Sequence, residues 1–511
     1  MAGDGQNLRP SPAGRARRRS NLLLLFRRAC GFFLLAFLLQ GLGCGTARQS
    51  EPPAARPPAV APAVPMAPAA VASLLDDLER RTFDFFWETA NPETLLVPDR
   101  WPTRSFSSVA AIGYAFNAYG IGAERGYVSR EAAAERTRRT LRFLVELPQG
   151  PEPRGNAGYR GFFYHFLDPE TGQRFERVEL STVDTSLLVA GALFSRGYFD
   201  RDNPVEREIR DLAERLYRRV EWEWARPNPP AISHGWHPET GFIRSDWRGY
   251  NEAMIVYLLA LGSPTHPIDP DAWEEWTRPY RLVRFHGQEY LDFAPLFGHQ
   301  FSHVWVDFRG IRDAVGRRLG FDYFENSRRA ALAQRAWAIA NPRGWKGLGA
   351  ESWGVSACDG PADVELTVNG ETRRFWTYAG RGVGPDFAID DGTLTPMAVA
   401  GSVAFAPEVV LPTLAALRQQ HGEALYGRYG FLDAFNPTFD FVDVPVHHGR
   451  VVPGHGWYDT DYLGLDQGPI LAMVENYRSD LVWRVMRRNP HLRRGLERAG
   501  FTGGWLDAPQ R

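Results

Sequence analysis

The sequence has few cysteines, which excludes a fold held together by disulfide bonds. Only three occur in 511 residues, at positions 30, 44 and 358. The first two lie in an N-terminal segment that resembles a leader, so the rest of the chain has Cys358 alone and cannot form an internal disulfide. Cys-x-x-Cys pairs, typical of zinc and redox sites, are absent as well.

Acidic residues outnumber basic residues outside the N-terminal segment. Lysine occurs once, at position 346. Residues 1–70 contain nine Arg and two acidic residues, which leaves 50 basic and 58 acidic residues in the remainder. A chain with this balance lacks the positive field that binding to a phosphate backbone requires, so nucleic acid is excluded as a main partner.

A membrane-spanning run is also missing from the N-terminal segment. The apolar run at residues 31–39 is shorter than the ~20 residues that cross a bilayer. Arginines precede it and small residues follow it, a pattern typical of a secretory signal. Residues 39–44, Leu-Gln-Gly-Leu-Gly-Cys, resemble a bacterial lipobox, so Cys44 is a candidate for lipidation, with ordinary cleavage nearby as the alternative. We expect an exported protein, in the periplasm or at the outer membrane as a lipoprotein.

The composition divides the chain into three parts. Residues 1–44 form the predicted signal peptide. Residues 45–72 form a linker, because positions 52–70 contain seven Pro and eight Ala, a composition that favours an extended spacer. Residues 73–511 form one domain with ample apolar material for a core, since the chain is 44% hydrophobic and 13% aromatic.

Helical periodicity dominates this domain, so the predicted fold class is all-α. Apolar stripes at 74–87 and 109–119 recur with the spacing of one helix face. Further helices are predicted at 129–147, 181–198, 204–224, 250–261, 325–339, 396–402, 407–419 and 468–477. The segments between them are short and rich in aromatic residues, too brief for a sandwich or a barrel wall.

Two of these segments repeat one another. Residues 161–172 and 232–241 both end in Pro-Glu-Thr-Gly, and each is predicted to form a small hairpin. Asp184 follows the first and Glu252 the second at nearly equal spacing, each in front of an apolar helix. A repeated order of hairpin, acid and helix fits an (α/α)6 toroid with short β-hairpins on the cleft face, in which acids at the starts of inner helices converge.

Acids in a first helical turn can also serve only to complement the helix dipole, for ~0.3–1 kcal/mol each. The accompanying aromatic residues favour a saccharide cleft instead, because sugar rings present apolar C–H faces to aromatic rings and hydroxyls to carboxylates, His and Arg. The aromatic residues that suggest this cleft are Trp236, Trp247, Tyr250, Trp305, Trp345, Trp353, Trp457 and Tyr458.

The sequence gives little support to other kinds of catalytic or metal site. His299 and His303 have the spacing of a helical metal pair, but Gln300 stands where a zinc protease needs its Glu, so we predict no metal and expect these histidines to contact a ligand or to be satisfied in the interior. Gly-x-Ser-x-Gly and phosphate-cradling loops are absent. A lone cysteine such as Cys358 is more often a buried apolar residue than a nucleophile. Paired carboxylates therefore remain as the candidate catalytic groups.

Several motifs carry a family resemblance. Residues 178–191, 249–267 and 295–303 are similar to the bacterial glycoamylase-like domain of β-1,2-glucanases and cyclic β-1,2-glucan synthases. Asp391–Pro396, Phe405–Glu408, Tyr429–Asn436 and Asp466–Ile470 extend the resemblance over about residues 73–505, in the right order.

This resemblance implies an (α/α)6 toroid and an endo-acting, inverting β-1,2-glucanase that needs no cofactor and takes a glucan oligosaccharide or polysaccharide as its partner. It implies that Glu252 is the general acid, and it matches Glu179, Asp184 and Asp466 to the other acidic motifs. The predicted substrate-binding residues are Trp236, Tyr250, His299, His303, Trp305, Trp353, Asp391 and Trp457. Two alternatives stay open: a glycan-binding lipoprotein without turnover, and a transglycosylase or epimerase on the same toroid.

Overall fold

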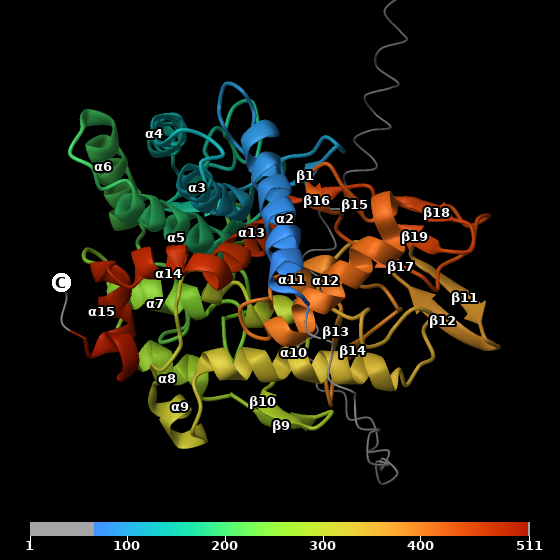
Figure 1. Cartoon of the computed structure of the whole chain (residues 1–511). Helices are drawn as coiled ribbons and strands as arrows, with labels where there is room; N and C mark the ends of the chain where they lie inside the picture. Colours follow the sequence, from blue (N-terminus) through green and yellow to red (C-terminus); the bar gives the residue numbers. More distant parts are fainter. Residues whose placement is uncertain (1–65, 509–511) are drawn as a thin grey trace, which may run out of the picture. The chain divides into compact units, whose positions relative to one another are not determined.

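The computed structural model describes residues 66–508 (Figure 1). The predicted signal peptide, Cys44 and most of the predicted linker lie outside these residues. Helix α2 (Pro68–Glu88) includes residues 68–72, which were expected to be linker, because Pro68 provides a favourable first helical residue. No helix among the described residues has both the length and the apolar character needed to cross a membrane.

One group of helices is buried on nearly every side. Every residue of α7 is buried, and only the last two residues of α3 are not. A helix that is apolar all round belongs in the interior of a protein. The members of this group are α3 (Val109–Glu124), α5 (Thr182–Tyr198), α7 (Met254–Gly262), α11 (Pro396–Ala400) and α13 (Gly464–Ser479).

A second group buries one stripe and turns a polar face outward. It comprises α2, α4 (Arg130–Glu146), α6 (Pro204–Arg218), α10 (Tyr323–Ala340), α12 (Pro407–His421) and α15 (Pro490–Arg498). Shorter helices are α8 (Asp271–Thr277), α9 (Ala314–Leu319) and α14 (Leu481–Met486). The predicted helices are confirmed, although α6 ends at Arg218, not at residue 224, because the chain turns there and buries Trp222 against Phe162.

The buried helices contact one another in chain order. Helix α3 packs on α5, α5 on α7, α11 on α13, and α13 returns to α3 (Figure 1). Between α7 and α11 lie two 3-10 turns, Leu296–His299 and Ser302–Val304. The Ser302 hydroxyl donates to the Glu252 carbonyl, and the Gln300 amide donates to the Ala398 carbonyl, so this segment connects α7 to α11.

Glycines allow the closest of these helix contacts. A Cβ placed on Gly113 of α3 would lie 2.4 Å from the Leu187 carbonyl oxygen of α5. A Cβ on Gly191 would lie 2.0 Å from the Gly113 carbonyl oxygen. Helices α3 and α5 therefore touch backbone to backbone, which fixes the first turn of α5 relative to α3.

Small antiparallel sheets surround the starts of the buried helices. The largest has the order β3-β4-β6-β7-β8, and a three-stranded sheet has the order β17-β19-β18. The strands of the first are β3 (Gly158–Tyr159), β4 (Phe162–Tyr164), β6 (Leu180–Ser181), β7 (Gly235–His237) and β8 (Gly241–Phe242). Those of the second are β17 (Phe435–Asn436), β18 (Arg450–Val452) and β19 (Gly456–Tyr458).

The remaining strands form two-stranded sheets, among them two hairpins that the periodicity did not predict. These hairpins are β9 (Leu282–Phe285) with β10 (Gln288–Leu291) and β11 (Val364–Val368) with β12 (Glu371–Phe375). The other pairs are β1 (Arg100–Trp101) with β20 (Tyr462–Leu463), β2 (Ser107–Ser108) with β5 (Phe166–Leu167), β13 (Gly382–Val383) with β14 (Ala388–Ile389), and β15 (Tyr426–Gly427) with β16 (Gly430–Phe431).

Both Pro-Glu-Thr-Gly segments form turns, as predicted. In the second, β7 pairs with β8, with Trp236 opposite Phe242. In the first, a single antiparallel bridge joins Leu167 to Arg174, and the Asp168 carboxylate accepts a hydrogen bond from the Thr171 backbone N–H at 2.8 Å.

A small second core lies under the β11–β12 hairpin and the β17-β19-β18 sheet. Its buried members are Trp345, Cys358, Ala362, Phe375, Ala434, Phe439 and Trp457. Cys358 and Ala434 each immediately neighbour an aspartate in the chain, Asp359 and Asp433. This core therefore fixes the loops that present those two carboxylates.

Candidate active site

Acidic residues stand at the starts of the buried helices. Asp184 lies in the first turn of α5, Asp466 in the first turn of α13, and Glu252 two residues before α7. The charge of Asp184 acts on Glu252, and the charges of Asp184 and Asp466 both act on Tyr114 of α3. The charge of Glu179 acts on Asp184 in turn. The structure thus brings the four predicted catalytic acids into one electrostatic neighbourhood.

Glu252 has the surroundings of a proton donor. Its side chain is buried, with the residue 3% exposed, and its Oε2 has no hydrogen-bond partner. Burial, together with the nearby charge of Asp184, raises the pKa of Glu252 to about 8. A carboxyl with that pKa stays protonated at neutral pH, which a general acid requires.

Asp184 is held by Ser181 on β6 and by His165, which lies in the bend between β4 and β5. The Ser181 hydroxyl donates to Asp184 Oδ2 at 2.5 Å, and His165 Nε2 lies 3.6 Å from the same oxygen. His165 Nδ1 in turn lies 2.8 Å from Glu179 Oε1. Although burial opposes a charged ring, the carboxylates of Asp184 and Glu179 raise the pKa of His165 to about 9. An imidazolium therefore lies between the two acids.

Glu179, the fourth predicted catalytic acid, forms an ion pair with this imidazolium. Burial would raise its pKa, but the charge and hydrogen bond of His165 lower it to about 2. Glu179 is consequently ionised at neutral pH and unsuited to donate a proton. Its contact with His165 indicates a positioning role; its predicted part in catalysis stays a prediction.

Asp466 lies among other aspartates. It is 5% exposed, and its Oδ2 has no hydrogen-bond partner. Burial and the surrounding aspartate charges raise the pKa of Asp466 to about 7. Tyr114 lies beside it and stacks on Trp305 at 5.0 Å between ring centroids. The indole N–H of Trp305 donates to Asn117, which like Tyr114 belongs to α3, and this hydrogen bond holds Trp305 against Tyr114.

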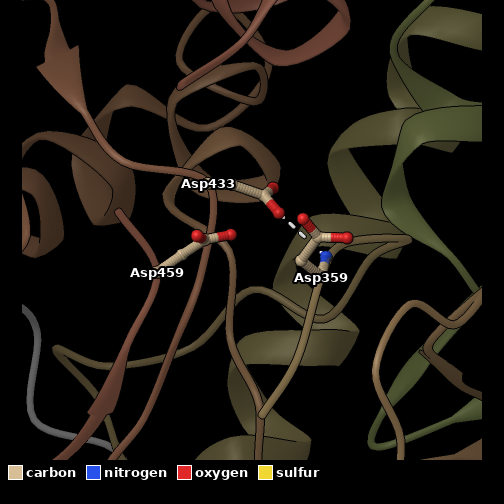
Figure 2. Close-up of side chains that lie close together, drawn as sticks. All are labelled: Asp359, Asp433 and Asp459. Atoms are coloured by element: carbon tan, nitrogen blue, oxygen red, sulfur yellow. Dashed lines mark hydrogen bonds between the residues drawn. The ribbon is translucent and has the colours of Figure 1, made fainter. Parts of the chain in front are cut away.

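Three aspartates that the sequence reasoning did not single out face one another (Figure 2), and all three interact with Asp466. Asp359, Asp433 and Asp459 are buried, and each offers an oxygen within 4.8 Å of the others. The Asp359 backbone N–H donates to Asp433 Oδ2 at 2.8 Å. Burial raises the pKa of Asp433 and of Asp459, and the charge of Asp466 raises that of Asp433 further.

Arg100 offsets part of this negative charge. Its Nη1 lies 2.7 Å from Asp359 Oδ2 and 3.6 Å from Asp461 Oδ2, and its Nε lies 3.5 Å from Asp99 Oδ2.

Within residues 66–508, Asp359, Asp433 and Asp459 form the one cluster whose geometry could hold a metal ion. Protonation also relieves the repulsion between these carboxylates, since burial favours the protonated form of a carboxyl.

Asp391, a predicted substrate-binding residue, is fully engaged by Arg381. The guanidinium contacts both carboxylate oxygens, at 2.9 and 2.8 Å, and both side chains are fully buried. Arg381 also donates to the Cys358 carbonyl at 2.6 Å. The pair therefore holds the chain that presents Asp359, and a direct contact of Asp391 with substrate stays a prediction.

The predicted aromatic contacts differ in exposure. Trp236 on β7 is half-buried and packs against Tyr159 and Trp224, with ring centroids 5.4 and 5.7 Å away. Trp353 and Trp457 are buried, and their indole N–H groups donate to Thr413 and to the His448 carbonyl. The structure places these two indoles in packed interior with their polar atoms satisfied; their part in substrate binding remains untested.

The two histidines and Tyr250 lie in the interior as well. His299 Nε2 contacts the Phe293 carbonyl at 3.0 Å, and His303 Nε2 contacts the Ser327 hydroxyl at 3.1 Å. Burial lowers their pKa values to about 4 and about 3, so both rings are neutral. Tyr250 packs on His299 at 4.9 Å between rings.

Sequence reasoning passed over His165 and Arg100 and the aspartates at positions 99, 359, 433, 459 and 461. Asp433 lies inside a segment that carried the family resemblance, 429–436, and could have been found there. Asp459 and Asp461 form an Asp-Thr-Asp sequence directly before α13, which was another available signal. Asp99 and Arg100 offered none, since they lie at the start of β1, far from the other acids in the chain.

The comparisons with known proteins agree with this geometry. Residues 244–490, which include Glu252, Asp433 and Asp466, match the model of the glycoamylase family, described as "Putative glucoamylase". This part of the chain is therefore similar to the glycoamylase family. A curated relative, an exo β-1,2-glucooligosaccharide sophorohydrolase (non-reducing end) of Parabacteroides distasonis, is 27% identical over 459 residues, which are 83% of this chain.

Solved structures also resemble this glycoamylase-like chain. An endo-β-1,2-glucanase of Chitinophaga pinensis, solved with sophorotriose and glucose, superposes with a TM-score of 0.73 at 27% identity, over 85% of this chain and 99% of that one. A β-1,2-glucanase of Parabacteroides distasonis gives a TM-score of 0.71 at 26% identity, over 85% and 60%. The match to the curated sophorohydrolase spans 57% of that protein's length.

Proposed function

We propose that this protein is a glycoside hydrolase that cleaves β-1,2-glucan within the chain and inverts the anomeric centre. The observation that carries the proposal is Glu252, a buried carboxyl with a raised pKa and a free oxygen, in a domain similar to β-1,2-glucan hydrolases. Protonation of the glycosidic oxygen by Glu252 makes the leaving sugar a neutral alcohol, which is the first requirement of glycoside hydrolysis.

The second requirement is a carboxylate that activates water. Asp466 Oδ2 has no partner, whereas Asp184 Oδ2 is bonded to Ser181 and faces His165. We therefore assign Asp466 as the general base and Asp184 as a positioning residue whose charge helps keep Glu252 protonated. An inverting pair needs ~6.5–9.5 Å between its carboxyls so that water fits between the base and the sugar.

The proposed framework is an (α/α)6 toroid. Helices α3, α5, α7, α11 and α13, with the two 3-10 turns at 296–304 as the sixth inner element, contact one another in chain order and return to α3. The amphipathic helices would then form the outer ring. This arrangement accounts for the gathering of the acids, because each inner element begins on the same side.

The proposed site of action is outside the cytoplasm, in the periplasm or at the outer membrane. The basis is the Arg-flanked apolar run and the lipobox-like residues 39–44. Fractionation of cells that produce the natural chain or its Cys44→Ala variant tests the anchor. Membrane association of the natural chain that is lost in Cys44→Ala supports lipidation, and soluble periplasmic protein in both cases contradicts it.

A panel of glucans tests the activity. We expect linear β-1,2-glucan to yield new reducing ends and a ladder of short oligosaccharides, while β-1,3- and α-1,4-glucans stay intact. Release of a single disaccharide from one end would contradict endo action. Binding without new reducing ends would contradict hydrolysis and favour a glycan-binding protein, and products of unchanged chain length would favour an epimerase.

A further inference from the structure

A cavity of about 220 Å³ lies between the loop at 346–352, the end of α12 and the β17-β19-β18 sheet. Asp459, in the acidic cluster, directly follows Tyr458, which lines this cavity. Successive side chains of an extended strand point to opposite faces, so the two residues serve different sites. The cavity has room for one group of about hexose size.

The lining differs in charge from the neighbouring acidic cluster. It contains no carboxylate, although the chain as a whole has 60 acidic residues. It contains Lys346, the single lysine of the sequence, together with His421, His455 and Gln420. A cavity that offers an ammonium, imidazoles and an amide without a competing carboxylate matches the chemistry of an oxyanion.

Lys346 is fixed in place but not neutralised. Its backbone N–H donates to the Thr438 hydroxyl at 2.9 Å, and its ammonium donates to the Gly454 carbonyl at 2.8 Å. Among the described residues it has no carboxylate partner, so two of its three N–H donors remain for a ligand. This contrasts with most arginines around it, such as Arg381 and Arg100, which are paired with aspartates.

Ser352 provides an independent observation. The residue borders the cavity and is 6% exposed, and its hydroxyl is buried with no hydrogen-bond partner. Its backbone forms an antiparallel bridge with Gly349, which fixes the position of that hydroxyl. Buried polar groups nearly always have partners in folded proteins, so an unpaired hydroxyl at a cavity wall points to a bound ligand.

We propose that this cavity binds an anionic group, a phosphoryl or a carboxylate, on a ligand of at most hexose size, with Lys346 and Ser352 as its contacts. Tyr458 completes the wall through its hydroxyl, which lies 2.8 Å from His421 Nδ1. The anion is either a free metabolite or an acidic substituent on the glucan. The inference goes beyond the proposed hydrolysis, because binding here requires no turnover.

Calorimetric titration of the whole protein with inorganic phosphate, glucose 6-phosphate and glucose tests the proposal. We expect glucose 6-phosphate to bind at least 10-fold more tightly than glucose, and Lys346→Met and Ser352→Ala each to weaken that binding at least 5-fold. Arg284→Met, on the exposed β9–β10 hairpin, is the matched control and should bind like the natural protein. Unchanged affinity for glucose 6-phosphate in Lys346→Met overturns the proposal, and equal affinity for glucose and glucose 6-phosphate excludes a free anion as the ligand.

Two substrates identify the source of the anion. If it is carried by the glucan, succinylated β-1,2-glucan has a lower KM than unsubstituted glucan, and Lys346→Met removes the difference without changing the rate on unsubstituted glucan. If it is free, the two glucans have equal KM values while phosphate or glucose 6-phosphate still binds. Absence of glucose 6-phosphate binding together with equal KM values overturns the proposal, whatever the hydrolytic activity.

Discussion

Glu252 and Asp466 both have an unpaired, buried carboxyl oxygen, which the other two predicted catalytic acids, Asp184 and Glu179, lack. Glu252 lies near a single charge, that of Asp184, whereas Asp466 lies among several aspartates. Asp184 and Glu179 share His165, which holds both in place. Among these four acids, hydrogen bonds therefore distinguish the two that we propose to react from the two that we propose to position them.

The first prediction compares Asp466→Asn with Asp184→Asn. We expect Asp466→Asn to lower kcat by at least ~10²-fold, because general base catalysis is worth about that much. Asp184→Asn should lower kcat less and shift the alkaline pKa of the pH profile downward, since it removes the charge that raises the pKa of Glu252. Steady-state rates on β-1,2-glucan across pH measure both. A larger loss of kcat in Asp184→Asn would exchange the two roles.

The second prediction concerns pH. The base must be deprotonated and the acid protonated, so kcat/KM should fall below pH ~7, where Asp466 gains a proton, and above pH ~8, where Glu252 loses one. A substrate with an activated leaving group needs no protonation, and with it the alkaline decline should disappear. A decline that persists with this substrate would contradict Glu252 as the acid.

At the scale of elements, the starts of α5, α7 and α13 determine where the acids lie. Apolar periodicity predicted these helices from the sequence because all three have long runs of apolar residues. It did not predict the hairpins β9–β10 and β11–β12, whose first strands, β9 and β11, alternate between exposed and half-buried residues. It also could not show that Arg100 reaches Asp359, because the two residues are 259 positions apart in the chain.

The third prediction tests the contact between α3 and α5. Gly113→Ala places a Cβ 2.4 Å from a backbone oxygen that cannot move without shifting α5. We expect a loss of ~1–3 kcal/mol in the free energy of unfolding, as for other overpacked cores, and a lower kcat because Asp184 moves with α5. Gly349→Ala is the control, since a Cβ there meets nothing within 4 Å. Equal denaturation midpoints for the two variants would contradict the close helix contact.

At the scale of the whole molecule, the described residues combine a helical body with an acid-rich site and a neighbouring basic cavity. The family resemblance and the position of Glu252 could be obtained from the sequence alone. The burial that raises its pKa could not, because it depends on how α7, the 296–304 segment and α5 pack around it. The same packing holds His299 and His303 inside as neutral rings, which spacing along the chain cannot reveal.

The most direct test of the central claim measures turnover and melting temperature of Glu252→Gln on β-1,2-glucan. The account predicts an unchanged melting temperature, retained glucan binding, and a loss of at least ~10²-fold in turnover that an activated leaving group largely restores. A variant that hydrolyses β-1,2-glucan at nearly the natural rate, while its melting temperature falls, would make Glu252 a structural helix-end carboxylate and would contradict the account.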